Sequence, residues 1–87
     1  MVKRTDLYTQ ALAKYGKLAQ EHVLLEEMSE LSKVILKGFR GQINAQELID
    51  EVADVEIMLE QIKWIYAITP QVYARKVYKK KRLEKRL

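Results

Sequence analysis

The chain has 87 residues, of which 48% are hydrophobic, and a formal net charge of +4 at pH 7. This length suits one domain over residues 1–87 with a small core, so we expect partner subunits to add buried surface. The sequence has no cysteine, which excludes disulfides and thiolate metal sites and leaves oxygen ligands for any metal. No apolar run approaches the roughly 18 residues of a membrane span, and no signal-type stretch follows the N-terminus. We therefore expect a soluble cytoplasmic protein with no membrane partner.

The charged residues are unevenly distributed along the chain. Residues 1–60 contain seven Lys or Arg and eleven Asp or Glu, whereas residues 61–87 contain nine and one. An acidic body therefore ends in a basic segment. Such a segment is typical of a nucleic-acid surface, but beside a metal site it can equally hold the phosphates of a nucleotide.

The residue pattern predicts helices throughout and no strand, which makes the domain all-α. The expected helices cover about 6–15, 17–37, 45–67 and 70–86. Gly16 is suited to end the first of them. Asn44 and Glu47 resemble a capping box that opens the third. Thr69 is a typical cap residue and is followed by Pro70, which suits the first position of a helix. This pair predicts the start of the fourth helix.

Two segments repeat one acidic spacing. Glu27 and Glu30 lie three residues apart, and so do Glu51 and Asp54. At about 3.6 residues per turn, the members of each pair lie on neighbouring turns of one helix face. On a helical wheel both pairs lie among apolar neighbours rather than on the polar side of their helix. A single pair with this spacing is common on solvated helices, but the two matched pairs favour a ligand site.

A turn between the two pairs can bring them together. The segment 38–41, Gly-Phe-Arg-Gly, is a natural place for the chain to reverse. In an antiparallel hairpin, the numbers of two facing residues add up to a constant. Glu27 and Asp54 add up to 81, and so do Glu30 and Glu51, so one hairpin register makes both pairs face each other. The hairpin therefore predicts a cluster of four carboxylates.

A cluster of four carboxylates among apolar side chains needs a cation. The charges repel one another, and burying an unpaired carboxylate costs enough free energy that the group would rather take up a proton. Oxygen ligands favour Mg²⁺, and Mn²⁺ would also fit. Protein-bound Mg²⁺ usually gains further ligands from substrate phosphates, so the cluster indicates a phosphate-ester or anhydride substrate. Such an ion can polarise a phosphoryl oxygen and activate an attacking water.

The acidic segments 26–30 and 51–54 resemble the E-E-x-x-E and E-x-x-D motifs of the MazG-like nucleoside triphosphate pyrophosphohydrolases, and the likeness extends over roughly residues 8–87. The resemblance implies an all-α fold in which helical hairpins from separate chains form a four-helix bundle, in a homodimer or homotetramer. It also implies Mg²⁺-dependent hydrolysis of a (d)NTP to (d)NMP and pyrophosphate. Metal-activated water would attack the α-phosphorus.

The resemblance also assigns roles to acidic residues by their positions in the motifs. The implied metal ligands are Glu27, Glu30, Glu51 and Asp54. Glu26 and Asp50 match acidic neighbours that bind a further ion or orient water. Glu26 or Glu27 is the candidate catalytic group that assists the attacking water.

Substrate contacts are implied outside the acidic segments. Lys79 and Arg82 fit a K-x-x-R pattern that contacts phosphates in relatives, and Gln20 is a candidate for reading a base edge. Many relatives also carry an asparagine in the basic region, but the only asparagine here is Asn44, so that contact is absent or replaced. Further aromatic candidates for base stacking, which suit core or subunit contacts equally well, are Trp64, Tyr66, Tyr73 and Tyr78.

Two other functions remain open. The chain also fits a nucleic-acid-binding or regulatory helical module whose basic residues 79–82 meet a phosphate backbone. A structural bundle without activity is the third possibility. The position of the final helix distinguishes the first two: packing over the acidic cluster favours the enzyme, and projecting away from it favours nucleic-acid binding.

Overall fold

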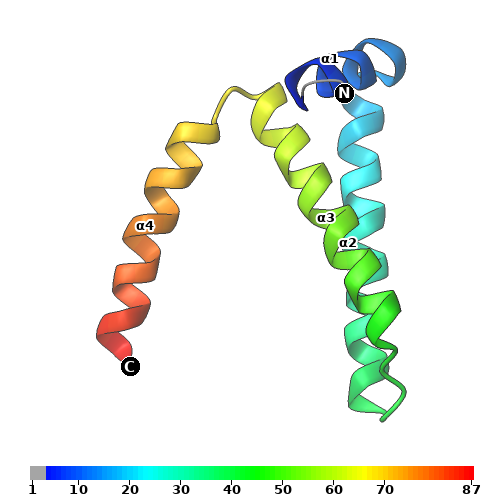
Figure 1. Ribbon diagram of the computed structural model, residues 1–87, viewed down its shortest axis with the longest axis vertical. Helices are drawn as coiled ribbons and strands as arrows, with labels where there is room; N and C mark the ends of the chain where they lie inside the picture. The colour runs from blue at the N-terminus through cyan, green and yellow to red at the C-terminus, as the bar shows by residue number, and fades with distance from the viewer. Residues whose placement is uncertain (1–3) are drawn as a thin grey trace.

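The computed structural model describes residues 4–87 and is all-α within that range. The helices are α1 (Arg4–Tyr15), α2 (Lys17–Phe39), α3 (Ala45–Ile65) and α4 (Thr69–Arg86) (Figure 1). The long helices α2 and α3 pack antiparallel as a hairpin, and α1 lies across the open end of that hairpin, where it contacts both. α4 leaves the end of α3 and projects away from the hairpin.

Local signals in the sequence set the ends of these helices. Gly16 separates α1 from α2 with a φ of +85°, and Gly41 reverses the chain after α2 with a φ of +72°. Glycine reaches this left-handed region without the steric cost that a Cβ brings. The predicted cap of α3 is confirmed, because the Glu47 backbone N–H donates to Asn44 Oδ1 at 3.1 Å. Lys37 Nζ lies 3.6 Å from Glu47 Oε2 and links the two helices beside this turn.

The connection between α3 and α4 differs from the expectation by a few residues. α3 ends at Ile65, two residues before the predicted end, and the chain leaves through Ala67 with a φ of +55°. α4 already includes Thr69, so Ile68 occupies the cap position and makes no side-chain capping bond. Pro70 lies in the first turn, as predicted, because its missing N–H is not needed there.

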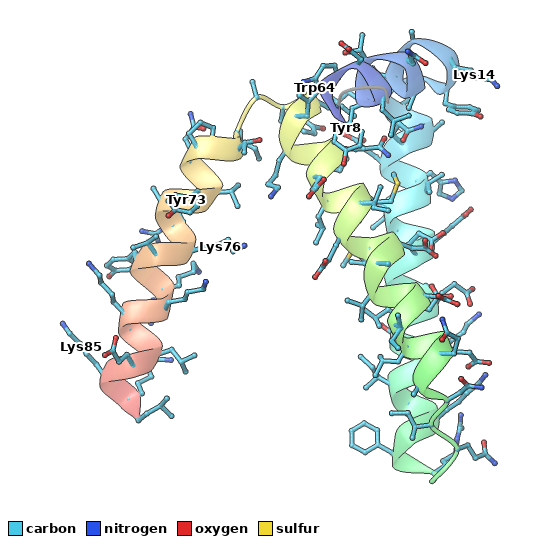
Figure 2. The ribbon with its side chains drawn as sticks, in the orientation of Figure 1. Tyr8, Lys14, Trp64, Tyr73, Lys76 and Lys85 are labelled. Carbon is cyan, nitrogen blue, oxygen red and sulfur yellow. The ribbon has the colours of Figure 1, made fainter. Side chains whose placement is uncertain are left out.

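Side-chain contacts tie together the open end of the hairpin. The Tyr8 hydroxyl of α1 donates to the Glu60 carboxylate of α3, and the Tyr66 hydroxyl donates to the Glu21 carboxylate of α2. Lys17 Nζ lies 4.2 Å from the centre of the Tyr66 ring, a cation–π distance. Tyr8 and the last turn of α3 lie together at this end in Figure 2. Tyr66, a candidate for base stacking, therefore has structural partners on α2.

The core of the described chain is small. The buried apolar residues are Tyr8, Val34, Val55 and Met58. Two glutamines, Gln20 and Gln61, are buried with them, and Gln61 Nε2 donates to Met58 Sδ at 3.7 Å. Among the described residues, no large side chain is completely enclosed.

α4 contributes no buried residue to this core. Among the described helices it approaches only α3, where Lys76 lines a groove together with Glu60 and Lys63. Tyr73 and Lys85 stand clear of the hairpin in Figure 2. Within residues 4–87, no helix combines the length and the apolar character that crossing a bilayer requires.

Candidate metal centre

Three carboxylates from two helices meet in the middle of the hairpin. Glu27 projects from α2, and Glu51 and Asp54 project from neighbouring turns of α3. One carboxylate oxygen from each lies within 4.8 Å of the other two. Glu27 and Glu51 are half-buried between the helices, whereas Asp54 is exposed. The centre therefore has a shielded inner side and an outer side open to solvent at Asp54.

The surroundings of this centre disfavour three unpaired negative charges. Burial raises the pKa of Glu27, and the negative charges of Asp54 and Glu51 raise it further. Glu51 Oε2 is inaccessible to solvent and has no hydrogen-bond partner. A buried carboxylate oxygen without a partner is costly, so either a proton or a cation must compensate the cluster.

The donor set fits a hard divalent cation. All three groups are carboxylates, and ligand oxygens on opposite sides of Mg²⁺ lie about 4.2 Å apart, from a metal–oxygen distance of about 2.1 Å. The three carboxylate oxygens here lie within 4.8 Å of one another, which is slightly more than that distance at most. Three protein ligands leave positions of an octahedral ion for water and phosphate oxygens.

The fourth predicted ligand is turned away from this centre. Glu30 lies one turn further along α2, is exposed, and its Oε1 lies 3.4 Å from Lys33 Nζ. A rotation of its side chain would be needed before it joined the other three carboxylates. Its role as a ligand stays a prediction. Lys33 was not singled out from the sequence, although its position three residues after Glu30 is a recognisable ion-pair spacing.

The two auxiliary acidic residues are also exposed and have partners on their own helices. Glu26 Oε1 lies 3.7 Å from His22 Nδ1, and Asp50 Oδ1 accepts a hydrogen bond from Gln46 Nε2 at 3.0 Å. Neither belongs to the group of three that could hold one ion. Their predicted roles with a further ion or with water are not tested by this arrangement.

The predicted substrate-binding residues lie at different distances from the centre. Gln20 is buried on α2, two turns before Glu27 and on the same side of the helix, since seven residues make almost two turns. Lys79 and Arg82 lie on α4, which projects away from the hairpin. Within one chain, the structure therefore does not bring the basic residues to the carboxylates.

Comparisons with known proteins identify no relative of this chain. No protein-family model matches it, and neither a curated protein nor a solved structure does. The chemistry of the three carboxylates and the position of α4 therefore carry the functional proposal.

Proposed function

We propose that the chain is a MazG-like nucleoside triphosphate pyrophosphohydrolase that converts a (d)NTP to (d)NMP and pyrophosphate. The observation that carries this proposal is the three-carboxylate centre, in which a shielded Glu51 oxygen lacks a partner and the pKa of Glu27 is raised. Mg²⁺, or Mn²⁺ in its place, would neutralise the carboxylates, bind the triphosphate and activate water. The water oxygen would form a bond to the α-phosphorus while the bond between the α-phosphorus and the oxygen that bridges it to the β-phosphorus breaks, so that pyrophosphate leaves.

The side chains have distinct roles in this proposal. Glu27, Glu51 and Asp54 hold the ion, and Glu30 joins them when its side chain leaves Lys33. Glu26 or Glu27 accepts the proton of the attacking water. Lys79 and Arg82 neutralise charge on the phosphates, and Gln20 contacts the base. The hairpins combine into a four-helix bundle in a homodimer or homotetramer, in the cytoplasm, where nucleotide substrates occur.

The decisive assay measures pyrophosphate released from a panel of NTPs and dNTPs with Mg²⁺, with Mn²⁺ and with EDTA. Glu51→Gln, which removes the buried charge and keeps the shape, is expected to lower the rate by about 100-fold or more, because the ion loses an anionic ligand. Glu30→Gln tests the ligand that is turned away in the structure.

Glu56→Gln provides the matched control on α3, because this exposed glutamate lies outside the carboxylate group. Its rate is expected to stay within about twofold of the wild type, as for a surface change. Wild-type activity in Glu51→Gln, or equal activity with EDTA, would refute the assigned centre.

The second candidate function, nucleic-acid binding, is favoured by the projection of α4. The helix carries eight Lys or Arg and one Glu, and none of its residues is buried. This function predicts binding of duplex or single-stranded oligonucleotides that persists in EDTA. The binding should weaken steeply with salt, because the Lys and Arg side chains of the protein displace counterions from the phosphates. Tight binding that resists EDTA, together with no pyrophosphate release, would select this function over the enzyme.

A further inference from the structure

Two buried glutamines face each other across the hairpin, at the end that α1 covers. Gln20 lies seven residues before Glu27 on α2. Gln61 lies seven residues after Asp54 on α3. Because seven residues make almost two helical turns, equal steps in opposite directions along antiparallel helices keep the two amides opposite each other. Only 6% of Gln20 and 9% of Gln61 is exposed, so both amides lie between the packed helices.

The hydrogen-bonding groups of these two amides are largely unused. Gln61 Nε2 donates to the thioether of Met58 at 3.7 Å, and within the described residues no other side-chain hydrogen bond involves either amide. In that part of the chain, Glu51 Oε2 is the one half-buried or buried side-chain oxygen or nitrogen that is fully enclosed without a partner, so the free amide atoms keep a small contact with solvent. A buried amide without partners costs folding free energy, and a ligand that supplied partners would remove that cost.

Helix α1 and two aromatic residues surround the covered end of the hairpin. Tyr8 of α1 is buried, and its hydroxyl donates to Glu60, the residue before Gln61. Trp64 follows Gln61 by about one turn of α3 and is half-buried, and both aromatic residues lie at this end in Figure 2. Two turns before Gln61, the same side of α3 is open to solvent at Asp54. The two amides therefore lie at the covered end of a line that starts at the open side of the carboxylate centre.

The separation between the amides and the carboxylates suits a nucleotide. Seven residues advance a helix by about 10 Å, which is of the order of the span from the phosphates to the far edge of the base in one nucleotide. Seven residues from Glu27 in the other direction lies Val34, which is apolar and buried, and beyond it Lys37 pairs with Glu47. Within the described residues, a ligand whose phosphates bind at the centre therefore meets buried amides with unused hydrogen-bonding groups toward α1 and not toward the turn.

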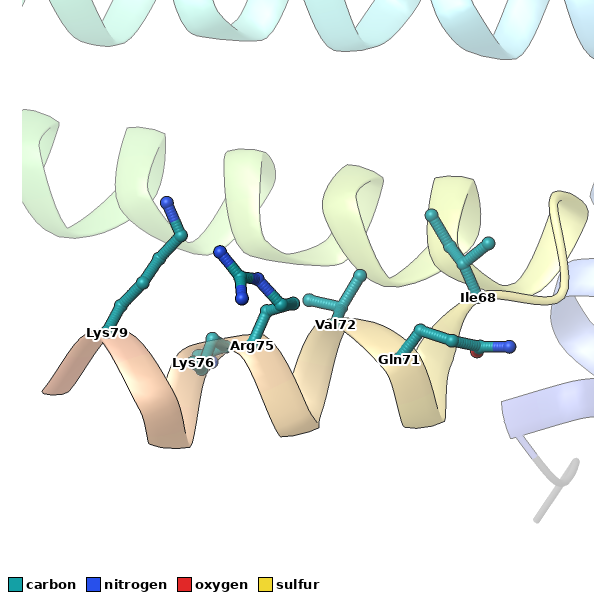
Figure 3. Close-up of a pocket in the computed structure, with 6 residues that line it drawn as sticks. All are labelled: Ile68, Gln71, Val72, Arg75, Lys76 and Lys79. Atoms are coloured by element: carbon teal, nitrogen blue, oxygen red, sulfur yellow. The ribbon is translucent and has the colours of Figure 1, made fainter. Parts of the chain in front are cut away.

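The open groove along α4 contains a glutamine of a different kind. Gln71 lines this groove together with Val72, Arg75 and Lys79 (Figure 3), but it is exposed, and no residue of α4 is buried. An exposed amide exchanges hydrogen bonds with water for hydrogen bonds with a ligand, so the net gain is small. A buried amide that is left unpaired by the wrong ligand discriminates more strongly. Gln71 therefore serves as the matched control for Gln61.

We propose that Gln61 is a second base-reading residue, and that Gln20 and Gln61 together hold one edge of the substrate's base beneath α1. This inference rests on the proposed function, in which the carboxylates position the phosphates. A glutamine amide offers a donor beside an acceptor, which matches a base edge that carries both. The substrate class is therefore a nucleotide with an intact base, rather than an inorganic polyphosphate or a sugar phosphate. Because both amides are buried, α1 has to shift before the base reaches them.

Base preference in Gln61→Met and Gln71→Met tests the role of Gln61. Methionine keeps the length of the glutamine side chain and removes its amide. Gln61→Met is expected to raise KM for the preferred nucleotide about tenfold with little change in kcat, and to narrow the spread of kcat/KM across the four bases, because the variant no longer distinguishes their edges. Gln71→Met should stay within about twofold of the wild type for every base. Equal losses for all four bases in Gln61→Met, or no base preference in the wild type, would overturn the proposal.

A binding measurement on the wild type keeps the base site separate from the proposed activity. In ¹⁵N-labelled protein, the side-chain NH₂ signals of Gln20 and Gln61, assigned with the two methionine variants, should shift when each of the four deoxynucleoside monophosphates is added with Mg²⁺. Inorganic pyrophosphate with Mg²⁺ should leave them in place, and the Gln71 signal should move with neither.

The two experiments fail in different ways. Nucleotide-dependent shifts at Gln20 and Gln61 without pyrophosphate release from any triphosphate would refute the enzyme and keep the base site. Pyrophosphate release without these shifts would keep the enzyme and overturn the role of Gln61. Equal shifts with inorganic pyrophosphate alone would also overturn it, because the amides would then respond to phosphate binding and not to a base.

Discussion

The α2–α3 hairpin and α4 show two different ways in which charge is placed on a helix. In the hairpin, three carboxylates lie on the two helices that also carry the buried residues Val34, Val55 and Met58, so the packing of α2 on α3 holds them close to one another. In α4, eight cations lie on a helix with no buried residue. Charged side chains that packing holds in fixed positions can form a binding site of defined geometry. Charged side chains on an unpacked helix attract ligands of opposite charge without fixing that geometry.

The two regions also differ in what stabilises them. The hairpin has a capped turn at one end and side-chain links at the other, through the hydrogen bonds of Asn44 and Tyr66. α4 is attached through a connection in which Ala67 takes a positive φ, a conformation that costs an L-residue of order 1–2 kcal/mol. The hairpin is therefore the stable unit of the chain, and α4 depends on what it packs against.

The largest expected difference between the regions is in their sensitivity to core truncation. Met58→Ala should lower the free energy of unfolding by about 2–4 kcal/mol, because it leaves a cavity and removes the partner of Gln61. Leu83→Ala on α4 should cost less than about 0.5 kcal/mol in the isolated chain, as an exposed change does. Urea unfolding monitored by circular dichroism measures both. A Leu83→Ala loss that grows with protein concentration would show that α4 is buried between copies.

A smaller effect concerns the metal centre alone. With Mg²⁺ at ten times its dissociation constant, the free energy of unfolding should rise by about 1.4 kcal/mol, because the ion binds only the folded chain. In a domain of this size that corresponds to a rise in Tm of roughly 5–10 °C. Glu51→Gln should abolish the rise, whereas Arg75→Ala should retain it, since α4 holds no ligand of the ion. A scan of Tm against Mg²⁺ concentration measures the effect, and an unchanged rise in Glu51→Gln would remove Glu51 from the centre.

The last prediction concerns the pH dependence of the metal-free hairpin. Because the folded-state pKa of Glu27 is raised, folding favours the protonated carboxyl. That contribution to stability is complete below the ordinary pKa of 4.5 and is lost as the pH rises through the raised value. Glu27→Gln should therefore gain stability relative to the metal-free wild type across this window, in urea titrations run at several pH values. Added Mg²⁺ should reverse the difference, and a constant difference at every pH would contradict the burial of Glu27.

Much of the fold could be predicted from local patterns. Gly16, Asn44 and Pro70 act through the backbone of their own neighbours, so the helix starts and stops near them could be located without the tertiary structure. The end of α3 was placed two residues too late, and the cap position expected at Thr69 is taken by Ile68, which makes no side-chain capping bond. Both differences lie next to Ala67, whose positive φ ends the helix. Sequence patterns rarely indicate a positive φ for alanine.

The acidic spacing by itself determined that Glu27 on one helix and Glu51 and Asp54 on the next could share one side of a hairpin. Only the tertiary structure decided that these three meet while Glu30 turns to Lys33, because the approach of packed helices and the choice of rotamer set which facing side chains come within reach. The basic composition of α4 was equally plain from the sequence. Its position away from the carboxylates of its own chain was not, because a short connection fixes the direction of a helix through a few backbone angles that composition does not encode.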